Sequence, residues 1–130
     1  MKGERKDSLS LMGALVSIVD DDESVRESLP DLLKELGFDV EAFASADAFL
    51  GSDAMARSRC LILDIAMPGM SGFELQSELA RRNIPLPIIF ITARQDEVVR
   101  QRALQQGAAA CLFKPFSEPA LLAALKAAIR

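Results

Sequence analysis

Short apolar runs of strand length recur five times in this chain of 130 residues, and a stretch with helical spacing follows each one. The runs are ALVSIV (14–19), DVEAF (39–43), CLIL (60–63), PIIFIT (87–92) and ACLF (110–113). The first helical stretch is the clearest, because its apolar residues form one stripe at Val25, Leu29, Leu32, Leu33 and Leu36. Since each crossover has the length of a helix, the strands should pair in parallel in a single α/β domain.

The composition of each run predicts its place in the sheet. The nearly continuous apolar runs at 60–63 and 87–92 should be central, because helices cover both faces of a parallel sheet, and the mixed run at 39–43 should be an edge. Ser45 and Ser117 are expected to cap the second and fifth helices. Pro30 is expected to kink the first helix, since it removes a backbone hydrogen bond.

Composition excludes several classes of function. The net charge of −4 argues against nucleic-acid binding by this chain, and no apolar run approaches the length of a membrane span. Without His, Trp or Tyr, the chain lacks imidazole chemistry and the usual aromatic platforms for flavins. Cys60 and Cys111 lie in apolar runs and are expected to be buried thiols of a cytoplasmic protein.

Residues 1–12 are polar without a period, so we expect a flexible leader before a domain over 13–130.

Polar residues that can carry chemistry stand where the apolar runs end. Asp20 and Asp21 follow the first run, Asp64 the third, Thr92 ends the fourth and Lys114 follows the fifth. Because ligands bind at the carboxyl ends of parallel strands, these side chains should converge on one rim of the sheet. Clustered carboxylates repel one another unless a cation compensates, and an all-oxygen site suits Mg²⁺ or Mn²⁺.

Four motifs in this order give the chain a family resemblance. With IVDDDESVRESL, LILDIAMPGMSG, IFITA and FKPF, residues 14–130 resemble the receiver domain of two-component response regulators. The resemblance implies a flavodoxin-like fold, with a five-stranded parallel sheet of order 2-1-3-4-5 and a cis bond before Pro115. It also implies that Asp64 is the phospho-acceptor. The acidic metal pair would be Asp20 and Asp21, and the residues that bind the phosphoryl group and carry the switch would be Thr92, Ala93 and Lys114.

The chemistry that the resemblance implies is phosphoryl transfer to a carboxylate. Asp64 would receive the group from a sensor histidine kinase or a phosphotransfer protein, because this chain has no His of its own. Mg²⁺ would be held by Asp21, Asp64 and the carbonyl of Ala66, with Asp20 acting through water. The response would be a change of the surface around the fourth helix, fifth strand and fifth helix. An output domain, for example one that binds DNA, is suggested by analogy alone.

One position departs from the family pattern and leaves an alternative open. Many receivers carry an aromatic residue three positions before the lysine, where this chain has Cys111. Strand alternation places Phe113 on the same face, one step further along. The chain is therefore either a phosphorylated receiver or a degenerate one that acts as a phosphorylation-independent interaction module. A flavodoxin-type carrier does not fit the acidic loop after the first strand, and an aspartyl phosphatase would have an acid in place of Ala66.

Overall fold

Within residues 12–129, which the computed structural model describes, the strands form one five-stranded parallel sheet. The strands are β1 (Leu15–Val19), β2 (Asp39–Phe43), β3 (Cys60–Asp64), β4 (Ile88–Thr92) and β5 (Ala110–Phe113). Their order is β2-β1-β3-β4-β5, which confirms the α/β class and the order that the resemblance implied. Apart from Met12, the predicted leader lies outside the described residues.

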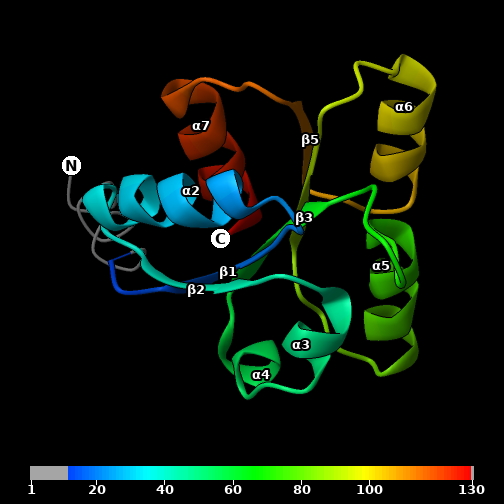
Figure 1. Ribbon diagram of the computed structural model, residues 1–130, viewed down its shortest axis with the longest axis horizontal. Coiled ribbons are helices and arrows are strands. Elements are labelled where there is room, and N and C mark those ends of the chain that lie inside the picture. Colours follow the sequence, from blue (N-terminus) through cyan, green and yellow to red (C-terminus); the bar gives the residue numbers. More distant parts are fainter. Residues whose placement is uncertain (1–11, 130) are drawn as a thin grey trace.

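Helices cover both faces of the sheet (Figure 1). They are α2 (Glu23–Glu35), α3 (Ala46–Leu50), α4 (Ala54–Arg57), α5 (Gly72–Arg81), α6 (Glu97–Gln105) and α7 (Glu118–Ala128). α2 and α7 lie on one face, and α3 to α6 lie on the other (Figure 1). The sequence does not predict α4, because a single helical turn is too short to show a period. None of the described helices is long and apolar enough to cross a bilayer.

The sheet separates two hydrophobic cores. Every residue of β1, β3 and β4 is buried, whereas β2 is partly exposed along its length. This confirms the predicted central strands and the predicted edge. Cys60 belongs to the core beneath α2 and α7, and Cys111 to the core on the opposite face. Both cysteines are free and buried, as predicted.

Helix ends follow the local sequence closely. The side chains of Ser45 and Ser117 accept hydrogen bonds from the N–H groups three residues ahead, at 3.1 and 3.2 Å, so both predicted caps are confirmed. α2 is continuous through Pro30, and Leu29 and Leu33 on either side of it are buried against the sheet. Packing therefore keeps the proline within the helix, and its expected kink stays a prediction.

Candidate functional site

Asp64 ends the central strand β3 and is only 6% exposed. The loop after it bends back at once: Gly69 has a φ of +75°, and the N–H of Gly72 donates to the carbonyl of Ile65 at 2.9 Å. Met67, in the same loop, is buried in the core under α5. The loop thus returns the chain to α5 while leaving the Asp64 carboxyl group at the rim of the sheet.

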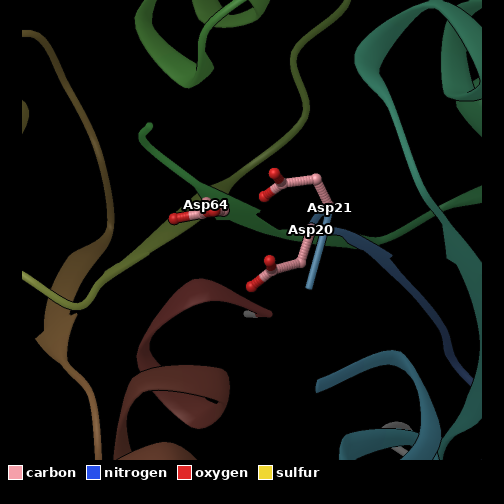
Figure 2. Close-up of side chains that lie close together, drawn as sticks. All are labelled: Asp20, Asp21 and Asp64. Atoms are coloured by element: carbon pink, nitrogen blue, oxygen red, sulfur yellow. The ribbon is translucent and has the colours of Figure 1, made fainter. Parts of the chain in front are cut away.

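Asp20 and Asp21 follow β1, which lies next to β3. Asp20 is fully buried, and its Oδ1 accepts a hydrogen bond from the N–H of Asp22 at 2.9 Å. Asp21 is exposed. The side chains of both residues extend toward Asp64 (Figure 2). Carboxylate oxygens of the three residues lie within 4.8 Å of one another. The structure therefore brings the three predicted carboxylates into one cluster.

Lys114 reaches this cluster from the end of β5. Its Nζ donates to Asp20 Oδ2 at 2.8 Å and lies 3.9 Å from Asp64 Oδ1. The main-chain N–H of Lys114 donates to the carbonyl of Thr92 at 2.8 Å, and the Lys114–Pro115 bond is cis. The ammonium group is thus paired most closely with Asp20, although it also faces Asp64.

Charge in the cluster is poorly balanced. Burial raises the pKa of Asp64 to about 7, and the negative charge of Asp20 adds to this effect, while Lys114 opposes it. A raised carboxyl pKa means that the anionic form is disfavoured, so an added cation would favour it. The three clustered residues offer only carboxylate oxygens, which are the ligands that Mg²⁺ prefers in proteins. The donor set therefore fits a hard divalent cation. Ala66, whose carbonyl is the further ligand that the resemblance implied, is exposed and lies two residues beyond Asp64.

Thr92 ends β4 next to Asp64's strand and is 3% exposed. Its Oγ1 accepts a hydrogen bond from the N–H of Arg94 at 3.2 Å, and a threonine hydroxyl can donate one hydrogen bond as well. Ala93 is exposed and begins the loop toward α6. The predicted hydroxyl therefore stands at the same rim as the carboxylates and the lysine.

Cys111 and Phe113 lie on the same face of β5, as strand alternation predicted. Cys111 packs in the core with Ala103 of α6, and burial raises the pKa of its thiol. Phe113 pairs with Thr92 in the sheet register and has the guanidinium of Arg100, from α6, at 5.4 Å from its ring centroid. The Phe113 ring, at the end of β5, is thus in contact with α6 through Arg100.

One residue beside the site, Arg26, is not predicted by the sequence. The Nη1 of Arg26, in α2, donates to the main-chain carbonyl of Asp20 at 3.0 Å. The only sequence signal was a basic residue a few positions after an acidic pair, and such a residue usually lies in solvent. The contact becomes visible only once α2 is folded back over the end of β1.

Comparison with known proteins agrees with this geometry. The family model described as the response regulator receiver domain matches residues 16–126. Nodulation protein W of Bradyrhizobium diazoefficiens is 46% identical over 115 residues, which cover 88% of this chain and 51% of that protein. The transcriptional regulatory protein FixJ of Azorhizobium caulinodans is 40% identical over 114 residues, which cover 88% of this chain and 54% of that protein. The chain thus spans about half the length of these relatives.

Solved structures give the same result. The response regulator StyR matches with a TM-score of 0.82 and 46% identity, over 90% of this chain and 59% of that one. The structure titled FixJ-N matches with a TM-score of 0.80 and 37% identity, over 90% of this chain and 94% of that one. With the fold, the acidic cluster and the family model in agreement, this chain belongs to the response regulator receiver domains of two-component systems.

Proposed function

We propose that this chain accepts a phosphoryl group on Asp64 and that the modification switches its surface. One observation carries the proposal: Asp64 lies buried at the rim of the sheet, in a cluster with Asp20 and Asp21 and with the Lys114 ammonium 3.9 Å from its Oδ1. A buried carboxylate at a strand end needs a partner to offset its desolvation, and this cluster supplies charge of both signs around it.

The transfer itself is a displacement at phosphorus. An Asp64 carboxylate oxygen attacks the phosphorus of a phosphohistidine on a sensor kinase or phosphotransfer protein, the P–N bond breaks, and the imidazole leaves and takes up a proton. The product on this chain is an acyl phosphate. The donor has to be another molecule, because the chain contains no His. Lys114 offsets the negative charge that builds up as the two anions approach each other.

Asp21, Asp64 and the carbonyl of Ala66 would hold the divalent cation, Mg²⁺ or Mn²⁺, with Asp20 acting through water. When bound, the cation supplies charge neutralisation between the carboxylate and the phosphoryl oxygens. The part that Asp20 plays agrees with its contacts, since one of its oxygens already accepts from Asp22 and the other from Lys114.

The switch would begin at Thr92 and the backbone of Ala93, which donate hydrogen bonds to the phosphoryl oxygens, and would extend to α6, β5 and α7. With Cys111 in place of an aromatic residue, we place the response mainly in the 93–96 loop and in Phe113.

The relatives extend well beyond the matched region, and one is named a transcriptional regulatory protein. We therefore propose that this receiver, acting in the cytoplasm, controls a DNA-binding output domain without contacting nucleic acid itself.

Acetyl phosphate provides a direct test. With Mg²⁺, intact-mass measurement should show one added phosphoryl group, and EDTA should prevent it. Asp64→Asn should abolish the increase, whereas Asp31→Asn, at an exposed position of α2, should leave it unchanged. Equal labelling of the Asp64→Asn variant would refute the acceptor assignment. A chain that takes up no phosphoryl group, yet binds its partners fully, would be the degenerate interaction module instead.

A further inference from the structure

Arg26 makes a contact that the proposed chemistry does not yet use. It lies near the start of α2, is half-buried, and its Nη1 donates to the carbonyl oxygen of Asp20 at 3.0 Å. The side chain therefore reaches back six residues, from the helix to the loop that carries two of the three clustered carboxylates.

That carbonyl belongs to the peptide unit that joins Asp20 to Asp21. Because a peptide unit is planar, holding its oxygen fixes the orientation of the whole plane and hence the direction in which the chain enters Asp21. Asp20 needs no such help, since it is fully buried and its carboxylate is bonded to the Asp22 N–H and the Lys114 Nζ. Asp21 is exposed, so packing restrains it less than it restrains Asp20.

We propose that Arg26 is a positioning residue for the divalent cation: by bonding the Asp20 carbonyl, it holds the 20–21 peptide so that the Asp21 carboxylate faces Asp64. The proposal rests on the proposed function, since it presumes that these carboxylates bind a cation. Residues that hold metal ligands in place commonly change metal affinity about tenfold or more when they are removed.

Two physical effects of Arg26 have opposite signs, and this makes the proposal testable. The guanidinium charge repels an incoming cation, so its removal alone would tighten binding. The hydrogen bond to the carbonyl preorganises the ligand, so its removal would weaken binding. The direction of the change in affinity therefore shows which effect dominates, whatever the absolute affinity is.

The experiment measures Mn²⁺ binding to the unphosphorylated chain by the EPR signal of the free ion. Arg26→Met removes both the charge and the donors while keeping an unbranched stem, and we expect Mn²⁺ to bind about tenfold more weakly. Arg26→Lys, which keeps the charge and a donor, should bind more tightly than the Met variant. Lys34→Met is the matched control: it removes one positive charge from the exposed end of the same helix and should leave the affinity within about twofold of the unchanged protein.

Unchanged or tighter Mn²⁺ binding by Arg26→Met would overturn the role of Arg26, as would a lower melting temperature in EDTA with no change in affinity. These outcomes leave the proposed function standing. A protein with its original sequence that binds no Mn²⁺ would overturn both, so the two failures are distinguishable.

Discussion

Adding a single methyl group at Gly72 should damage both the fold and the site. Gly72 begins α5 and packs directly on the end of β3. A Cβ built on it would lie 2.5 Å from the Asp64 carbonyl oxygen, 3.0 Å from the Ile65 Cα and 3.1 Å from Cε1 of Phe90. The two nearest of these atoms are backbone, so no side-chain rotation can relieve the clash.

The backbone that would have to move is tied down on both sides. The N–H of Ile65 donates to the Ile91 carbonyl at 3.2 Å, and the carbonyl of Ile65 accepts from Gly72 at 2.9 Å. Overpacking of this kind costs about 1–3 kcal/mol, and we expect the upper half of that range because backbone must shift. For a domain of this size each kcal/mol lowers the melting temperature by about 3–5 °C, so Gly72→Ala should melt about 10 °C lower.

Thermal unfolding by circular dichroism measures the first effect, and the initial rate of mass increase with acetyl phosphate measures the second. Since the displaced atoms belong to the proposed acceptor, the rate should fall by about tenfold to a hundredfold below the melting range. Gly51→Ala is the matched control, because its Cβ would meet only ordinary contacts at 3.5 and 3.9 Å and its φ is −84°. An unchanged melting temperature and labelling rate in Gly72→Ala would show that the end of β3 can accommodate the methyl group, contrary to this prediction.

Three further outcomes are expected. Lys114→Ala leaves the buried Asp20 carboxylate without its ammonium partner, so the melting temperature should fall in EDTA and recover in part with Mg²⁺. A decrease in melting temperature that Mg²⁺ does not relieve would contradict this prediction. Both cysteines should resist a thiol reagent at pH 8 until urea is added, because they are buried and burial raises the pKa of Cys60 to about 12. Rapid labelling of the folded protein would contradict this prediction. With beryllofluoride, a phosphoryl mimic, amide protection should change mainly in the 93–96 loop, because the buried Cys111 side chain is too small to remodel much surface. Equally large changes along the whole of β5 would contradict this expectation.

Much of the fold was predictable because its determinants are local. Strand and helix periods are read over a few residues, and the strands were predicted to within one residue at each end. Parallel pairing followed from the length of the crossovers, and the convergence of Asp20, Asp64 and Lys114 followed from the polarity of parallel strands. The short helix α4 escaped prediction, since one turn carries no period.

The order and the ends of the apolar runs are therefore enough to place these residues at the rim of the sheet. Tertiary structure alone decided how they pair there. Lys114 contacts Asp20 more closely than Asp64, across 94 positions of the chain, and Arg26 bonds a main-chain carbonyl rather than a carboxylate. Such choices depend on side-chain rotamers and on distances of a few tenths of an ångström between elements. Those distances are set by how α2 and the end of β5 pack on the sheet, and no local pattern of residues records them.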